Sequence, residues 1–470
     1  MKKYLVSKDA TVLKAMEVIE KGAISVAFAV NKNSQLCGVI SDGDIRRALL
    51  DGYPMQGQIK KVLNKEYFYA KQGDDYSKLF QTYGSYIKIL PIVDKKKRVV
   101  DYIGYDRNAK IPIASPSLLG NEFNYLTNAF LSTWISSTGE YINRFEEEFA
   151  KFCGCRYGVA VTNGTVALHL ALSALGIGEG DEVIVPDLTF AASANAVLHA
   201  KAKPVIVDVD QEYWTIDPMQ ITKAITARTK AIMPVHLYGQ PCRMDEIMRI
   251  AKKKKLLVVE DCAEAHGAEF DGKRVGSFGD IGCFSFYANK VITTGEGGMC
   301  VTNSKKLYDK MRVLRDHGMS KTKKYWHDEI GFNYRMTNIQ AAIGCAQLER
   351  IDENLKRRRI LENKYRKMFS GHAYIKFQKD RPRGKRITWL ISALITNGQR
   401  GKFLKELLNK GIDTRPFFYS LGEMPIYKKY LFSNTNSKEI SAMGLNLPTQ
   451  NNLNDKELER ILSVAEKYAD

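Results

Sequence analysis

Long apolar runs are absent from this sequence. No stretch of its 470 residues approaches the ~18 consecutive apolar residues that a membrane-spanning helix needs. The first residues, MKKYLVSKD, are basic but lack the apolar segment of a secretory signal peptide. Both absences argue against a membrane span and against secretion, so we expect a cytoplasmic protein.

Cysteine is sparse as well. The eight cysteines are scattered, with one C-x-C pair and no C-x-x-C motif. This spacing indicates neither a zinc site nor a disulfide framework. We therefore expect no bound metal, and reduced thiols that are mostly buried.

Negative charge is in deficit: 52 aspartates and glutamates stand against 71 lysines and arginines, a net charge of +19. Each basic run alone is most simply a solvated helix face or loop, but together the runs favour an anionic partner, which could be nucleic acid, an acidic membrane surface or a phosphorylated small molecule. We find no helix-turn-helix, zinc-finger or RNA-recognition signature, so we expect an anionic metabolite and no nucleic acid. The runs are 95–98, 252–255, 356–359 and 381–386.

The length of the chain predicts about three domains, at ~150 residues per domain. Residues 1–110 form two similar short patterns, each a helix followed by strand, turn and strand. From residue 158 onward, seven β-rich runs alternate with helical patterns, which predicts a large, mostly parallel seven-stranded sheet covered on both faces. Charged helical patterns around one strand-like run predict a smaller C-terminal α/β domain. We therefore expect domains at 1–110, 111–355 and 356–470.

The first N-terminal pattern contains GVISDGDIRRALL, which resembles the loop and helix of a CBS motif. Two such motifs in tandem make the adenosine-nucleotide-sensing module of that family, and the resemblance implies that Ser41 and Asp44 contact phosphate and ribose. A hydroxyl and the amides at a helix start suit a phosphate, and a carboxylate suits a ribose diol. In the second pattern Gly104 and Arg107 replace the hydroxyl and the acid. A degenerate module kept for dimerisation or packing is therefore an equally open interpretation.

Residues that follow the apolar runs are candidate site residues, because ligands of open parallel sheets lie at the carboxyl ends of strands. After GVAV come Gly164 and Thr165 at the start of an apolar helix, where free amides and the helix dipole favour a phosphate. After LLVVE comes Asp261, with Glu264 three residues on. Such an acid could cap the next helix or hold a protonated pyridine nitrogen. An ordinary N-cap explains the first pair equally well, so neither strand end decides the function alone.

A third strand end carries Lys290 in SFYANKVITTGEGG, five residues after Ser285. A strand-end lysine usually reaches water, and it is almost never fully buried without a chemical reason. In an apolar pocket its pKa falls, and the neutral amine can attack a carbonyl to form a Schiff base. At a fourth end, Phe190 offers a flat surface for a ring. A phosphate cradle, an aromatic plate, an acid and a lysine in this order match what pyridoxal phosphate (PLP) requires of a protein.

Residues from about 115 to 470 resemble the DegT/DnrJ/EryC1/StrS sugar aminotransferases, which are fold type I PLP-dependent transferases acting on nucleotide-linked keto sugars. The matching segments are NGTVALHLAL, VPDLTFAASANAV, VEDCAEAHGA, GDIGCFSFYANKVITTGEGG and GFNYRMTNIQAAIGCAQLE. The resemblance implies that Lys290 is the Schiff-base lysine and proton shuttle, and that Asp261 partners the pyridine nitrogen. It also implies that Phe190 stacks on the ring and that Glu264, where many relatives carry glutamine, lies near its phenolic side.

The resemblance further implies a site shared between subunits, and hence a homodimer or a higher assembly. Trp326 and His327 precede the loop of Asn333 and could touch the sugar, although a packed tryptophan and a surface histidine are the simpler interpretations. His236 of PVHLYG is similarly ambiguous. The implied phosphate contacts are Gly164, Thr165, Ser285 and, from the neighbouring subunit, Asn333.

Within the family, WISSTGEYINRFEEEFAKFCG and IDTRPFFYSLGEMPIY look most like GDP-perosamine synthases, which aminate C4 of GDP-4-keto-6-deoxymannose with L-glutamate. That resemblance implies two half-reactions with ping-pong kinetics, and a place in the synthesis of bacterial surface polysaccharide such as lipopolysaccharide O-antigen. Two alternatives are open. One is an aminotransferase for a UDP- or dTDP-linked keto sugar, and the other is a nucleotide-sensing regulator on an inactive aminotransferase scaffold.

Overall fold

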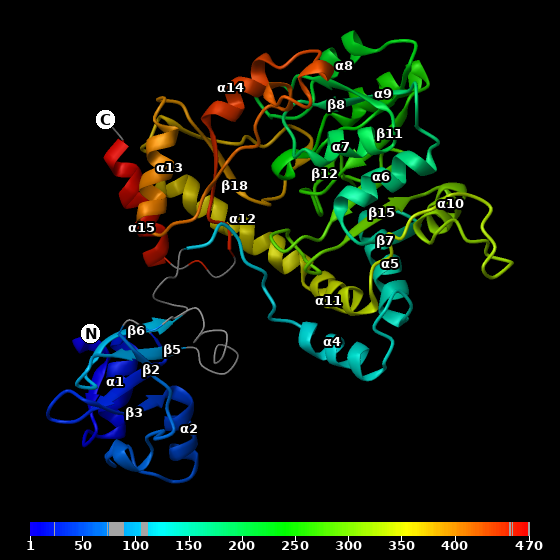
Figure 1. The fold of residues 1–470 in the computed structure, drawn as a ribbon. Helices are drawn as coiled ribbons and strands as arrows, with labels where there is room; N and C mark the ends of the chain where they lie inside the picture. Colours follow the sequence, from blue (N-terminus) through cyan, green and yellow to red (C-terminus); the bar gives the residue numbers. More distant parts are fainter. Residues whose placement is uncertain are drawn as a thin grey trace. The chain divides into compact units, whose positions relative to one another are not determined.

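The computed structural model describes residues 1–22, 24–72, 74, 89–104, 111–450, 453 and 455–468. The chain divides into two units, Met1–Lys110 and Ile111–Asp470, each with its own core (Figure 1). Among the helices in these described ranges, none is both long and apolar enough to cross a membrane.

The first unit contains two small sheets of the same topology. In each, the first strand pairs in parallel with the second, and the second pairs in antiparallel fashion with the third. Val30 and Val93 occupy equivalent irregularities of the two antiparallel pairs and share one core, which confirms the strand part of the predicted tandem repeat. The helical pattern expected from residue 76 and Arg107 lie outside the described residues. The elements are β1 (Leu5–Ser7), α1 (Val12–Gly22), β2 (Val26–Val30), β3 (Leu36–Ser41), α2 (Asp42–Leu50), β4 (Ala70–Lys71), β5 (Ile89–Val93) and β6 (Val99–Gly104).

A seven-stranded sheet of order β7-β15-β14-β11-β10-β8-β9 forms the centre of the second unit. The seven runs expected from the sequence are these seven strands, so that prediction is confirmed. Within the sheet, β15 runs antiparallel to both neighbours, and the other neighbouring pairs are parallel. The strands are β7 (Tyr157–Val161), β8 (Glu182–Pro186), β9 (Lys203–Val207), β10 (Thr229–Ile232), β11 (Leu257–Asp261), β14 (Ile281–Ser285) and β15 (Gly298–Thr302).

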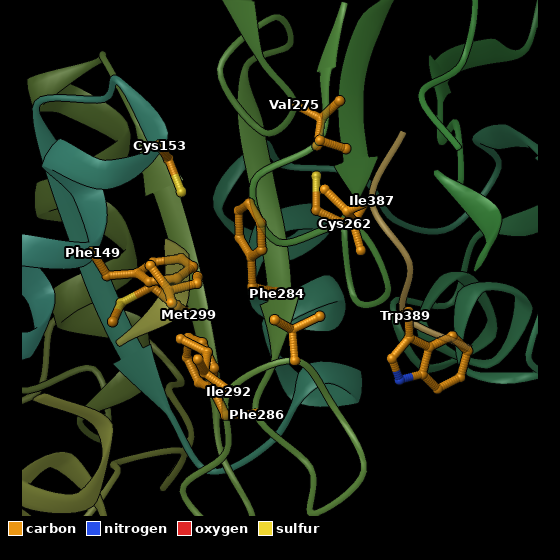
Figure 2. Close-up of a cluster of buried hydrophobic side chains, with 14 of the residues drawn as sticks. Phe149, Cys153, Cys262, Val275, Phe284, Phe286, Ile292, Met299, Ile387 and Trp389 are labelled. Carbon is orange, nitrogen blue, oxygen red and sulfur yellow. The ribbon is translucent and has the colours of Figure 1, made fainter. Parts of the chain in front are cut away.

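Helices cover both faces of this sheet (Figure 1). Val183 and Val185 of β8 pack in one core with α6, α7 and α10, whereas the intervening Ile184 packs with α8 and α9, as the period of two in a buried strand requires. On that second face α5 places Phe149 edge to face with Phe284 of β14, with ring centres 4.9 Å apart (Figure 2). The helices are α5 (Glu140–Cys153), α6 (Gly164–Ala174), α7 (Ala192–His199), α8 (Pro218–Ala224), α9 (Met244–Lys254) and α10 (Lys305–Arg315).

A smaller α/β layer follows toward the C-terminus, as predicted. Its antiparallel sheet of order β16-β18-β20-β19 shares a core with α12, α13 and α15. Because α12 runs through residues 355 and 356, one continuous helix spans the domain boundary expected there. The elements of this layer are α12 (Ile351–Met368), β16 (Ile375–Phe377), β18 (Ile391–Ile395), α13 (Arg400–Asn409), β19 (Arg415–Pro416), β20 (Gly444–Leu447) and α15 (Asp455–Ala465). The unit also contains α4 (Glu122–Leu131), β12 (Glu269–Phe270), β13 (Lys273–Arg274), α11 (Asn338–Glu349), β17 (Gly384–Lys385) and α14 (Thr435–Met443).

Candidate active site

One cavity of about 550 Å³ lies at the carboxyl ends of β7, β8, β11 and β14. Ligands of parallel sheets bind at this edge, and the volume is typical of small-molecule sites. Trp389 and Phe418, which the sequence analysis missed, are part of the lining. The sequence-predicted residues that line it are Gly164, Thr165, Phe190, Asp261, Glu264, Ser285 and Lys290.

The start of α6 and the end of β14 form one end of the cavity. Asn163 caps the helix, since its Oδ1 accepts a hydrogen bond from Val166 N at 3.0 Å. The first amides of a helix have no partner within it and attract anions. A Cβ on residue 164 would lie 2.8 Å from Cβ of Ser285, so Gly164 is what lets the helix start approach the strand this closely. This end can therefore bind a phosphate through amides and the Ser285 hydroxyl.

Asp261 ends β11 and is 5% exposed. Its Oδ2 accepts a hydrogen bond from Ser193 Oγ at 2.8 Å, and its Oδ1 accepts one from Ala263 N at 3.1 Å, which closes a turn rather than capping a helix. Thr189 Oγ1 lies 3.0 Å from Ser193 Oγ. Burial raises the pKa of Asp261, and both hydrogen bonds oppose the rise. The carboxylate is thus oriented and suited to a cationic partner.

Lys290 lies in the loop between β14 and β15, and its side chain is 10% exposed. Its Nζ lies 4.0 Å from Oε1 of Glu264 and 3.9 Å from the ring centre of Trp389. Burial lowers the pKa of Lys290, while the carboxylates of Glu264 and Asp261 oppose the fall. The site therefore favours the neutral, nucleophilic amine more than water does.

Glu264 is held from two sides. Its Oε2 accepts a hydrogen bond from Tyr238 N at 2.8 Å, while Oε1 faces Lys290. Burial raises the pKa of Glu264 to about 7, against the opposing charge of Lys290. Tyr238 stacks against both Trp389 and Phe418, with ring planes within 17° and 21°. An aromatic stack built from distant parts of the chain therefore forms the wall beside the amine.

Phe190 remains available to a ligand, because it is 59% exposed and its ring centre lies 5.7 Å from that of Phe418. Of the residues that the sequence analysis missed, Ser193 had only a weak signal: it follows Thr189 by four positions in DLTFAAS, but Thr189 lies before the start of α7, so no shared helix face marks the pair. Trp389 and Phe418 had none, since each reaches the cavity through tertiary packing.

Asn333, Trp326 and His327 are not part of the lining of this cavity. Oδ1 of Asn333 instead accepts a hydrogen bond from Arg335 Nε at 3.1 Å. Trp326 is 51% exposed, so the interpretation of a packed tryptophan is wrong, whereas His327 lies on the surface as expected. The role of Asn333 at a neighbouring subunit's cavity and the contact of Trp326 and His327 with the sugar stay predictions.

Ser41 and Asp44 form hydrogen bonds with each other at the start of α2. Ser41 Oγ accepts a hydrogen bond from Asp44 N, while Asp44 Oδ2 accepts bonds from Ser41 N at 2.9 Å and Ser41 Oγ at 2.7 Å. Asp44 also pairs with Arg47 at 2.6 Å. These bonds form a capping box, and contact with a nucleotide stays a prediction.

His236, Glu260 and Cys262 form a buried cluster behind Asp261. His236 lies between Glu260 Oε2 at 3.2 Å and the backbone amide of Cys242 at 3.1 Å, and its own amide donates to Asp261 O at 3.0 Å. These bonds occupy the ring nitrogens that a metal would need, so His236 supports the strand end that carries Asp261. The remaining donors to Glu260 are the amides of Gly276, Phe278 and Gly279.

Comparisons with known proteins agree with this site. Residues 116–465 match the model of the DegT/DnrJ/EryC1/StrS aminotransferase family, and residues 2–51 match the CBS domain. The chain is 46% identical to a GDP-perosamine synthase of Escherichia coli O157:H7 (77% of this chain, 99% of that protein) and 45% identical to one of Caulobacter vibrioides (76% and 98%). The solved structure of an aminotransferase from Psychrobacter cryohalolentis is 31% identical, with a TM-score of 0.70 over 75% of this chain and 98% of that one. The chain belongs to the DegT/DnrJ/EryC1/StrS aminotransferase family.

Proposed function

We propose that this chain is a PLP-dependent aminotransferase that moves the amino group of L-glutamate to C4 of GDP-4-keto-6-deoxymannose and so makes GDP-perosamine. The observation that carries the proposal is Lys290, a largely buried lysine in one cavity with Asp261 and with a helix start whose free amides suit a phosphate. The nucleotide and the sugar are supported by two relatives, both named GDP-perosamine synthase and both matched over nearly their whole length. A net charge of +19 suits a diphosphate substrate.

The residues of the cavity fit PLP. The bare Cα of Gly164 leaves the α6 amides and Ser285 Oγ open to a phosphate. Asp261 offers a carboxylate to a pyridinium nitrogen, and the half-exposed Phe190 offers a ring face. When bound, PLP would supply a carbonyl for Lys290 to attack and a ring that withdraws electrons. We infer that these residues hold it.

Lys290 has two tasks in this proposal. Its neutral amine is the nucleophile, and the same Nζ then moves a proton from the α-carbon of bound glutamate. Low exposure excludes water, which would otherwise compete for that proton. Glu264, 4.0 Å away, is close enough to exchange a proton with the amine after a small rotation. The carboxylate of Asp261 would stabilise the positive charge of a pyridinium nitrogen.

We also propose a homodimer in which Asn333 completes the neighbouring cavity. Support comes from the position of Asn333 on the surface, outside its own cavity. Further support comes from apolar side chains left exposed on and beside α4, which a monomer rarely leaves in water. These side chains are Leu118, Leu119, Phe123, Phe130, Leu131 and Trp134.

The N-terminal unit is, in our proposal, a sensor that binds a regulatory nucleotide through Ser41 and Asp44. The match of residues 2–51 to the CBS domain supports this role. The repeated sheet topology supports it as well, because a tandem pair is the unit in which such motifs work. A cytoplasmic location and a role in surface polysaccharide synthesis stay predictions.

The direct test uses the full chain loaded with PLP, ¹⁵N-labelled L-glutamate, and GDP-, UDP- and dTDP-linked 4-keto-6-deoxy sugars. Mass spectrometry should find the ¹⁵N-amino sugar with the GDP sugar alone. Product only with another nucleotide would overturn the assignment of the substrate. If visible absorbance responds to glutamate but no sugar is aminated, the whole sugar class is wrong.

A further inference from the structure

Arg358 on α12 is a buried cation that carboxylates do not neutralise. It is 3% exposed, and within the described part of the chain it forms no ion pair. Its neighbours on the same helix do: Arg357 pairs with Glu353 at 2.6 Å, and Arg359 pairs with Asp380. The sequence analysis expected the basic run 356–359 to be a solvated helix face or loop, and Arg358 is an exception to that expectation.

The guanidinium of Arg358 binds two backbone carbonyls from distant segments. Nη1 donates to Trp389 O at 2.5 Å, and Nη2 donates to Lys290 O at 3.2 Å. The indole of the same tryptophan donates from Nε1 to Asn289 O at 3.0 Å, and its ring faces Lys290 Nζ at 3.9 Å. Both carbonyls of the Asn289–Lys290 pair are thus bound from outside their own loop.

The buried position of the Arg358 guanidinium is unfavourable for the free energy of folding. A buried charge without a counter-charge is penalised, and an apolar side chain of similar volume would usually serve packing at least as well. Burial indeed lowers the pKa of Arg358 to about 10. A planar fork can, however, bridge two acceptors, which a lysine or an apolar residue cannot. In Figure 2 Trp389 lies on a chain segment that is separate from β14 and β15. The two hydrogen bonds of Arg358 link that segment to the loop that carries Lys290.

We propose that Arg358 is a positioning residue that holds Lys290 at its working place by binding the carbonyls of Lys290 and Trp389. The inference rests on the proposed function, because it presumes that Lys290 is the reacting amine. Arg358 touches no reacting atom itself.

The test compares Arg358→Met and Arg358→Lys with wild type. In cofactor-free protein, the rate at which acetic anhydride labels Lys290 is followed against pH by peptide mass spectrometry. Arg358→Met should move the midpoint of labelling upward, toward that of an ordinary lysine, because the loop that carries Lys290 is no longer held and the amine becomes less buried. In PLP-loaded protein, kcat should fall by roughly ten- to a hundredfold with KM for glutamate little changed, since a misplacement of about 1 Å costs that much. Arg358→Lys can bind one of the two carbonyls but cannot bridge both, so it should recover only part of each effect.

Arg357→Met is the matched control, because this arginine is exposed on the same helix and, among the residues that the structure describes, its ion pair is with Glu353. It should leave the midpoint and kcat unchanged. A folded Arg358→Met protein with the labelling midpoint of wild type would overturn the proposal. If that variant does not fold, Trp389→Phe, which keeps a ring but loses the bond to Asn289 O, should shift the midpoint in the same direction, and no shift would overturn the proposal. Labelling needs no substrate, so an error in the assigned sugar cannot be mistaken for an error here.

Discussion

Oε1 of Glu264 lies 4.0 Å from Nζ of Lys290, and both side chains are largely removed from water. A carboxyl and an amine at this distance titrate as a pair, because the charged form of each stabilises the charged form of the other, whereas burial penalises both charged forms. Burial raises the pKa of Glu264 to about 7 and lowers that of Lys290. The pair therefore links the charge state of the cavity to pH.

We expect Glu264→Gln to remove a pH dependence of stability from the cofactor-free protein. Folding raises the pKa of Glu264 from 4.5 to about 7, so its contribution to stability is present below pH 4.5 and is lost as pH rises through 7. Glutamine does not titrate. The free energy of unfolding of the variant, relative to wild type, should therefore increase between pH 5 and pH 8, by on the order of 2 kcal/mol.

Urea unfolding at these two pH values measures the difference. Glu296→Gln is the control, because Glu296 lines the same cavity and is exposed. A stability difference for Glu264→Gln that is the same at both pH values would show that this carboxyl does not titrate there.

Lys290→Ala and Lys290→Arg should both abolish amino transfer without unfolding the protein. Alanine removes the amine, and arginine stays protonated at any working pH, so neither offers a neutral nucleophile. Transfer of ¹⁵N from glutamate measures the loss, and circular dichroism reports the fold. Lys305→Ala, on the surface of α10, is the control. Turnover close to wild type in either Lys290 variant would refute its role.

Ser193→Ala should move the acidic limb of the pH–rate profile upward. Ser193 Oγ donates to Asp261 Oδ2 at 2.8 Å and so favours the ionised form. Without that bond the pKa of Asp261, already raised by burial, rises further, and a larger fraction is protonated at a given pH. The measurement is kcat against pH between 5 and 8. Ser437→Ala, which removes a hydroxyl from another buried aspartate, Asp187, is the control, and a shift of equal size in both would contradict the assignment.

The strand ends could be predicted because their signals are local. Each apolar run of the large sheet is bounded by polar residues, and parallel strands bring their carboxyl ends to one edge, so Asp261 and Lys290 were expected at the same edge. The adjacency of β11 and β14 came only from the structure. The direction of β15 could not be predicted, since GGMCVTN has the same pattern as a parallel strand.

Residues that act through tertiary packing escaped the sequence analysis. Arg358 sits in a run of four basic residues, and the sequence analysis read the whole run as solvated. The helical period was a usable signal, because Arg358 lies seven residues after Ile351 and three before Leu361, on the buried face of α12. Trp389 begins a strand-like run and meets Lys290 only because two distant segments pack together. Ser41 and Asp44 show the opposite case, in which one short motif predicts a helix cap and a ligand contact equally well.

Gly164→Ala should weaken PLP binding more than it destabilises the fold. The added Cβ would lie 2.8 Å from Cβ of Ser285, at the end of the cavity that we assign to the phosphate. Overpacking of this kind costs about 1–3 kcal/mol. Titration with PLP measures affinity, and thermal unfolding measures stability. Gly178→Ala is the control, because its Cβ would meet only Ala200 O at 3.7 Å. Unchanged PLP affinity would place the phosphate elsewhere.

Ser41→Ala in the full chain separates the two interpretations of the N-terminal motif. Losing the capping box should destabilise the first unit by about 1 kcal/mol whichever interpretation holds, so stability alone does not decide. We expect wild type to release or absorb heat on titration with an adenine or guanine nucleotide, and Ser41→Ala to bind it at least tenfold more weakly. Asp42→Asn, on the exposed side of the same first turn, should bind like wild type. Equal binding by Ser41→Ala, or no heat from wild type, would leave the motif as a cap and the unit as a packing or assembly module.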